Sequence, residues 1–200
     1  MKLIFPCYYV GVTQGFKSTH KAIDLGWDKK YGGPDHKIIS PADGVVTYVK
    51  NNVNGKTKNI TYGNYIKINH GNGVYTLMAH LKYNSVTVKV GDKVKQGQVI
   101  GIMGNTGYSF GVHCHYEVYI NKKRVNPFNY TYYTDKHVVG SNTMKKYKPK
   151  KEESEVNSDM DETDNKVVLE VDNTVFEYIC PKTGIYKIKL NENEKLIIKD

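Results

Sequence analysis

Five residues have types and spacings that suit metal binding and proton transfer: His20, Asp24, His80, His113 and His115. His20 and Asp24 are four positions apart and His113 and His115 are two apart, so each pair returns to one face of an extended strand. A catalytic zinc ion commonly takes three nitrogen or oxygen ligands from the protein and keeps one position open. Three of these residues could hold the ion, and the other two histidines could carry protons near neutral pH. A solvated, histidine-rich strand face is the alternative for His113 and His115 taken alone.

The residues around these candidates predict short strands joined by tight turns. Asn64–Asn69 and Val74–Leu81 flank Gly71-Asn72-Gly73, a pattern typical of a β-hairpin. Further strands are expected on both sides of an Ala-Asp-Gly turn within 37–50, and at 86–90, 98–103 and 113–118. No amphipathic helix is predicted in residues 1–130. The pattern indicates an all-β fold, arranged as a sheet or a sandwich.

The composition changes after residue 140. Residues 141–165 join a basic block to an acidic one with almost nothing apolar, which is typical of a disordered linker. Strand-like patterning returns at Val167–Val171, Val175–Ile179, Ile185–Leu190 and Leu196–Ile198. We therefore expect a main domain over 1–140, a charged linker over 141–165, and a small β-rich C-terminal segment of unknown role over 166–200.

The formal net charge of the chain is +9, and the basic excess lies in residues 1–140. Such a surface favours anionic partners, among them nucleic acid, membranes and polyanionic cell walls. No nucleic-acid-binding motif accompanies the charge, so no nucleic-acid partner is expected. No apolar run approaches the roughly 20 residues of a membrane span. The apolar start of the chain is short and broken by Pro6, so no signal peptide is expected.

The cysteines and the remaining histidines of the first 100 residues show no comparable pattern. Cys7, Cys114 and Cys180 are widely spaced and odd in number, which argues against a disulfide framework. Cys114 lies between two histidines and should point to the opposite face of its strand, into packing. His36 and His70 lie in expected loops or turns, and we expect both to be exposed.

The order of the motifs resembles that of the lysostaphin-type zinc metalloendopeptidases, which cut peptidoglycan peptides. That family pattern is H-x-x-x-D, a lone histidine in A-H-L, and H-x-H followed by an aromatic residue and Glu. The corresponding segments here are His20-Lys-Ala-Ile-Asp24, Ala79-His80-Leu81 and His113-Cys-His115-Tyr-Glu117. Segments 40–46, 63–66, 90–101 and 104–109 also resemble the family, and the likeness covers roughly residues 10–130.

The resemblance implies a compact antiparallel β-sheet sandwich with a groove over zinc. It implies that His20, Asp24 and His115 bind Zn²⁺ and that His80 and His113 form the catalytic pair. One histidine, with His113 as the first assignment, would take a proton from water. His80 would stabilise the oxyanion or protonate the leaving amine. The sequence does not decide which of the two is the general base.

Several residues near these motifs could have supporting roles. Members of the family often carry a tyrosine shortly before the first ligand, but Gln14–Thr19 contains none. Glu117 shares a strand face with the two histidines, so it should bond one of them or form an ordinary ion pair. Tyr108 and Asn105 lie in a loop that borders the groove in the family, where they would contact substrate or only shape a turn.

The resemblance therefore predicts a zinc endopeptidase that hydrolyses cross-bridge or stem-peptide bonds of bacterial peptidoglycan. Without a signal peptide, delivery by host lysis or as a virion component is expected, as in a phage-type lysin. A bacterial wall-remodelling enzyme is the runner-up. The alternative class is a non-catalytic wall-binding or structural module of a phage assembly, and residues 166–200 could contact other phage or wall-associated proteins. All five site residues are present, which favours the enzyme.

Overall fold

The computed structural model describes residues 2–31, 33–140, 143, 150–151, 165–171, 174–180 and 195–198. The chain divides into two compact units, residues 1–152 and 153–200. The expected linker at 141–165 and the expected strand at 185–190 lie almost wholly outside the described residues. The boundaries at 140 and 165 therefore stay predictions.

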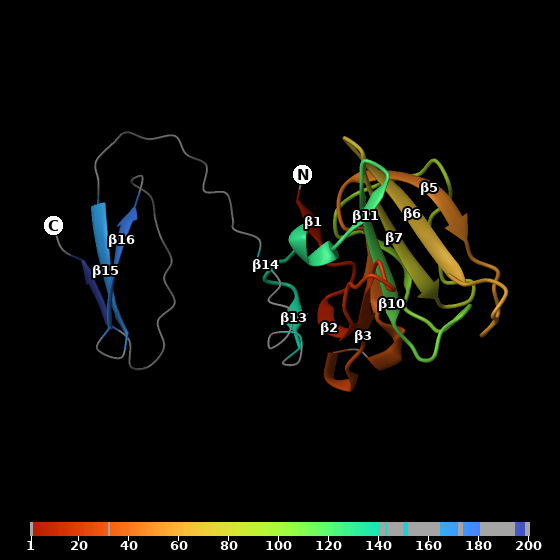
Figure 1. Ribbon diagram of the computed structural model, residues 1–200, viewed down its shortest axis with the longest axis horizontal. Coiled ribbons are helices and arrows are strands. Elements are labelled where there is room, and N and C mark those ends of the chain that lie inside the picture. Colours follow the sequence, from red (N-terminus) through yellow and green to blue (C-terminus); the bar gives the residue numbers. More distant parts are fainter. Residues whose placement is uncertain are drawn as a thin grey trace. The chain divides into compact units, whose positions relative to one another are not determined.

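The described part of the first unit consists of strands and three short 3₁₀ helices, which confirms the predicted all-β class (Figure 1). The strands are β1 (Leu3–Ile4), β2 (Tyr9–Gln14), β3 (Ile23–Gly26), β4 (Lys37–Ile39), β5 (Gly44–Lys50), β6 (Asn64–Gly71), β7 (Val74–Leu81), β8 (Lys93–Val94), β9 (Val99–Ile102), β10 (Cys114–Ile120), β11 (Lys123–Val125), β12 (Thr131–Tyr133), β13 (Val138–Val139) and β14 (Lys150–Lys151). The helices are η1 (Lys29–Tyr31), η2 (Gly33–Asp35) and η3 (Pro127–Asn129).

The main sheet has nine strands in the order β13-β2-β3-β10-β7-β6-β5-β8, with β11 added to β10. Its central pairs are antiparallel, as the sequence predicts, and β10 lies between β3 and β7. Two smaller sheets, β4-β9 and β1-β12-β14, complete the unit. The pairs β1–β12, β12–β14 and β13–β2 are parallel and were not anticipated from the sequence. The position of β10 matters most, because it carries the H-x-H motif to the middle of the sheet.

The local turn chemistry explains most of these elements. The predicted hairpin is confirmed by β6 and β7, whose turn places Asn72 at φ 48° and Gly73 at φ 74°. The Ala-Asp-Gly turn joins strands of two different sheets, since β4 pairs with β9 whereas β5 pairs with β6. The strand expected at 86–90 is wrong. Thr87 N–H donates to Ile100 and Gly91 N–H donates to Val46, so the segment never follows a single partner strand.

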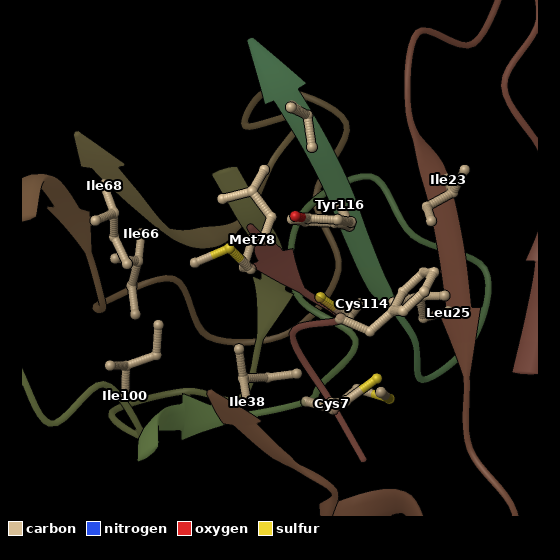
Figure 2. Packing of buried hydrophobic residues seen from close by; sticks show 14 of the residues in the cluster. Cys7, Ile23, Leu25, Ile38, Ile66, Ile68, Met78, Ile100, Cys114 and Tyr116 are labelled. Atoms are coloured by element: carbon tan, nitrogen blue, oxygen red, sulfur yellow. The ribbon is translucent and has the colours of Figure 1, made fainter. Parts of the chain in front are cut away.

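Alternating side chains give the main sheet one buried face (Figure 2). Cys114, Tyr116 and Val118 on β10 are fully buried and belong to the same core cluster as Met78 on β7 and Ile66 on β6. The prediction that Cys114 points into packing is confirmed. The intervening positions of β10 therefore lie on the opposite face, where the candidate site is found.

His36 and His70 are buried, so the expectation that they are exposed is wrong. They are 6% and 5% exposed. His70 reaches the Asp43 carbonyl oxygen with Nδ1 (2.9 Å) and the Thr76 hydroxyl with Nε2 (2.8 Å). The His36 ring stacks on Tyr9 at 6.0 Å between centroids. Burial lowers the pKa of both histidines, so they act as neutral packing groups with satisfied polar atoms.

The second unit contains β15 (Asn165–Val171), β16 (Thr174–Cys180) and β17 (Lys195–Ile198). They form an antiparallel sheet in the order β16-β15-β17, with Val171 opposite Thr174. These strands coincide with three of the four segments expected from the sequence. Across the described ranges, the chain contains no helix with the length and apolar content that a bilayer crossing requires.

Candidate active site

Three adjacent strands bring the five candidate residues together. His115 on β10 lies opposite Asp24 on β3 and opposite Ala79 on β7 in the sheet register. His80 follows Ala79. His20 comes four residues before Asp24 and is held by a backbone bridge to Lys17. His113 precedes β10 and is held by a bridge to Gly104. The sheet register therefore places the three sequence motifs at one point.

His20, Asp24 and His115 offer ligand atoms that all lie within 4.8 Å of one another. Asp24 Oδ1 is 3.3 Å from His20 Nε2 and 3.0 Å from His115 Nδ1. Each of the three side chains is 13–14% exposed. A cluster of two imidazoles and one carboxylate that still reaches solvent is a suitable ligand set for a catalytic divalent metal ion.

Hydrogen bonds outside the cluster orient each of these imidazoles. His20 Nδ1 lies 3.2 Å from the Gly15 carbonyl oxygen, and His115 Nε2 lies 3.1 Å from Glu117 Oε1. A nitrogen that faces such an acceptor keeps its hydrogen, so the opposite nitrogen, on the side of Asp24, is the one that a metal ion could take. The ring orientations therefore fit a metal ion as well as the residue types do.

His80 and His113 lie beside this cluster, with ring centroids 4.7 Å apart. His80 Nδ1 is 2.8 Å from the Thr106 carbonyl oxygen, and His113 Nδ1 is 2.8 Å from the Gly111 carbonyl oxygen. His113 Nε2 lies 3.8 Å from Asp24 Oδ1. The two rings thus follow the same rule: an outer carbonyl oxygen fixes Nδ1–H, and Nε2 stays available to a substrate or water.

The backbone at His80 is unusual for a residue with a side chain. His80 has φ 62°, in the left-handed region, and its N–H donates to the Tyr62 carbonyl oxygen at 2.9 Å. Such a conformation persists where surrounding contacts hold it, and it is found often at functional sites. Here it turns His80 away from the strand alternation of β7 and beside His113.

Burial and neighbouring charges shift the pKa values of Asp24, His80 and His115. Burial raises the pKa of Asp24, but the hydrogen bond from His115 and the nearby histidines outweigh it and leave that pKa lowered. Burial lowers the pKa of His115, but hydrogen bonds to Asp24 and Glu117 raise it to about 9. Burial and the neighbouring His113 lower the pKa of His80 to about 4. At neutral pH His80 is therefore a neutral imidazole.

Glu117 forms a charged network behind His115. Its side chain is 1% exposed, and Oε1 accepts from Tyr62 at 2.8 Å and from Arg124 at 3.3 Å. Tyr119 donates to the other carboxylate oxygen. Burial raises the pKa of Glu117, but these hydrogen bonds and His115 lower it to about 2. Both alternatives expected for Glu117, a bond to a histidine and an ion pair, are present.

The site opens into a cavity of about 680 Å³ that is lined by all five candidate residues. The lining also includes Gln14, Thr19, Tyr62, Tyr108 and Phe110. Gln14–Thr19 therefore supplies no tyrosine, as expected, but Tyr62 reaches the cavity from the loop before β6. Tyr62, Phe110 and the buried Thr106 were not singled out in the sequence, because they lie in loops and belong to no local motif.

A β-sheet that carries a His-Asp-His cluster beside two free histidines is typical of a metallopeptidase. The profile of the peptidase family M23 matches residues 18–127, more than half of the chain. The chain belongs to peptidase family M23. The prediction of a lysostaphin-type metallopeptidase is thereby confirmed at the level of the family.

Relatives and solved structures agree with this assignment. An "Uncharacterized metalloprotease" of Buchnera aphidicola is 43% identical over 112 residues, which cover 56% of this chain and 26% of that protein. The "DD-carboxypeptidase/endopeptidase Mpg" of Neisseria meningitidis is 45% identical over 90 residues, which cover 45% of this chain and 19% of that protein. A zinc-containing peptidase from Vibrio cholerae superposes with a TM-score of 0.52 at 27% identity, covering 63% of this chain and 39% of that one. The chain thus spans only 26% and 19% of the length of these two curated relatives.

Proposed function

We propose that the protein is a zinc-dependent endopeptidase that hydrolyses peptide bonds of bacterial peptidoglycan, in a cross-bridge or stem peptide. The observation that carries the proposal is the convergence of His20, Asp24 and His115 beside two histidines whose Nδ1 atoms are held by backbone carbonyl oxygens. The peptidoglycan substrate is supported by the family and by relatives named as endopeptidases.

His20 Nε2, Asp24 Oδ1 and His115 Nδ1 would hold the zinc ion. A zinc ion bound there would polarise the scissile carbonyl and make a water molecule more acidic. The ring orientations leave an open side toward the cavity, where the substrate backbone would lie. Gly15 and Glu117 would keep the two ligand rings turned toward the ion.

His80 and His113 are the proposed proton carriers. Both have Nδ1–H directed at a carbonyl oxygen, so each neutral ring presents Nε2 as a proton acceptor. His113, whose Nε2 is nearest to Asp24, takes the proton of the attacking water in our first assignment. The proton taken from water is returned to the leaving amine, directly or through His80, whose ring centroid lies 4.7 Å from that of His113.

A narrower form of the proposal places the enzyme in phage-mediated wall lysis or penetration. The runner-up is a bacterial wall-remodelling enzyme, which the bacterial relatives favour. Contacts of residues 166–200 with other phage or wall-associated proteins belong to the same proposal. A non-catalytic wall-binding module remains the alternative class, and the five site residues weigh against it.

The test is zinc analysis and digestion of purified peptidoglycan, with mass analysis of the released fragments. Wild-type protein should contain one zinc ion and release peptide fragments, and Asp24→Ala should lose both properties. Asp35→Ala is the matched control, because Asp35 is an exposed aspartate paired with Lys82 outside the cavity. A zinc-free wild type that binds the wall without cutting it would overturn the enzyme and support the alternative.

A further inference from the structure

The loop between β9 and β10 is fixed to a neighbouring loop by backbone contacts. Gly107 N–H donates to Gly55 at 3.0 Å, and Tyr108 N–H donates to Thr61 at 3.1 Å. Gly107 has φ 77°, and a Cβ there would lie 2.3 Å from Gly63 N. Only glycine permits this approach. The loop therefore enters the site from a fixed anchor.

The other end of the same loop is tied to the catalytic pair. Ser109 Oγ donates to the Gly111 carbonyl oxygen at 2.9 Å and lies 3.3 Å from His113 Nδ1. His113 N–H donates to the Gly104 carbonyl oxygen at 3.1 Å. Residues 108–112 are thus held between two anchors, and the side chains that they project have a defined place relative to His113.

This fixed loop projects two aromatic rings at the candidate active site. Phe110 is 83% exposed and Tyr108 is 49% exposed. Their rings contact edge to face, with centroids 5.3 Å apart and an interplanar angle of 70°. Both residues line the same cavity as His80 and His113. An apolar ring that is exposed to solvent beside an active site can bury its surface against a bound ligand, which stabilises the complex.

We propose that Tyr108 and Phe110 form an apolar wall that selects peptides with an aliphatic side chain next to the scissile bond. This inference rests on the proposed function. Because both rings line the cavity that holds His80 and His113, they would meet peptide groups close to the cleaved bond rather than the more distant glycan strand. Next to the scissile bond, an alanine residue offers a methyl group to such a wall and a glycine residue offers no side chain. The substrate class is therefore an alanine-containing stem-peptide link rather than a glycine cross-bridge.

The fixed loop makes this contact effective. A wall that is already in place loses little conformational freedom when the substrate binds. One methyl or methylene group in an apolar pocket changes kcat/KM by about tenfold or more. We expect a preference of that size, which is large enough to measure with paired substrates.

The test uses two synthetic cross-linked peptides of equal length, with D-alanine or glycine on the acyl side of the scissile bond. Zinc-loaded wild type should cleave the alanine peptide with about tenfold higher kcat/KM. Phe110→Ser and Tyr108→Ser should bring the ratio toward one by slowing the alanine peptide. Tyr83→Ser is the matched control, because Tyr83 is 45% exposed and lies outside the cavity lining. An unchanged ratio in Phe110→Ser, or a wild-type preference for glycine, would overturn the proposal.

Binding separates this inference from the proposed function. If zinc-loaded wild type cleaves neither peptide, the proposed function fails, and calorimetric titration of both intact peptides still tests the wall. Tighter binding of the alanine peptide that is lost in Phe110→Ser supports it. Equal binding of the two peptides refutes it.

Discussion

The ring of His115 is held by Glu117, whose Oε1 lies 3.1 Å from Nε2. Glu117 is a buried carboxylate whose pKa is about 2, so it accepts rather than donates in this contact. Nε2 therefore keeps its hydrogen, and Nδ1, which faces Asp24 at 3.0 Å, is the nitrogen that a metal ion could take. The buried carboxylate of Glu117 thus determines which nitrogen of His115 is turned toward Asp24 and the proposed metal site.

Substitution of Glu117 should weaken metal binding without removing a ligand. We expect Glu117→Ala to lower zinc affinity by about 10- to 100-fold, because the His115 ring loses its orienting acceptor. Tyr62, Tyr119 and Arg124 would also lose a shared partner, which should cost about 1–3 kcal/mol of unfolding free energy. Glu117→Gln keeps an acceptor oxygen and should lose less affinity. Competition with a chromogenic chelator and urea unfolding measure the two effects, with Asp35→Ala as the control.

Zinc affinity should increase with pH. Burial lowers the pKa of His115, but hydrogen bonds to Asp24 and Glu117 raise it to about 9 in the metal-free protein. Zinc must displace the proton on Nδ1, so the apparent affinity should rise by up to about tenfold per pH unit until pH approaches 9. Chelator competition between pH 6.5 and 9 checks this. A flat profile would show that His115 is already unprotonated at neutral pH.

The same shift predicts how the stability of the metal-free protein depends on pH. His115 has a pKa raised from 6.5 in the unfolded chain, so its stabilising contribution is complete below pH 6.5 and is lost as pH rises toward 9. His80 has a pKa lowered from 6.5 to about 4, so stability is lost as pH falls from 6.5 toward 4. Urea unfolding across these two windows should show a maximum near pH 6.5. His115→Gln should abolish the alkaline decline and leave the acid one.

The two classes of histidine should separate in a mutational series. His113→Ala should retain zinc and lose about 10²- to 10⁴-fold in kcat, because a proton carrier is removed while the ligands stay. His115→Ala should lose the metal and the activity together. His70→Gln serves as the control, since His70 is a buried histidine that lies outside the cavity lining. Near-wild-type turnover by His113→Ala would refute its assignment.

Alanine substitution at Gly107, which fixes the loop that carries Tyr108 and Phe110, can be compared with the same substitution at Gly97. Gly107 and Gly97 have nearly equal φ, 77° and 79°, but a Cβ at Gly97 meets nothing within 4 Å. Both alanine variants bear the backbone strain of about 1 kcal/mol, and only Gly107→Ala also collides with Gly63. We expect Gly107→Ala to unfold at lower urea concentration than Gly97→Ala and to lose activity. Equal effects would show that the loop adapts.

The alternation of side chains along the expected strands predicts much of the main sheet. Alternation along residues 113–118 predicts the split between Cys114 in the core and His115 on the open face, because the side-chain period of a strand is two. The local sequence pattern does not show which residues from distant parts of the chain will contact one another. Tyr62 and Glu117 are 55 residues apart, and nothing near either residue indicates their contact. The burial of His36 and His70 was not predicted for a similar reason, since the Tyr9 ring that stacks on His36 and the Asp43 carbonyl oxygen that bonds His70 each lie 27 residues away.

The centre of the main sheet joins distant parts of the chain, with Asp24 and His115 separated by 91 residues. During synthesis β3 exists long before β10, and pairings of such long range form late and slowly. A nascent chain that ends after β3 therefore holds only two of the three proposed ligand residues. The proposed metal site, and any reaction that depends on it, can form only after β10 has paired with β3.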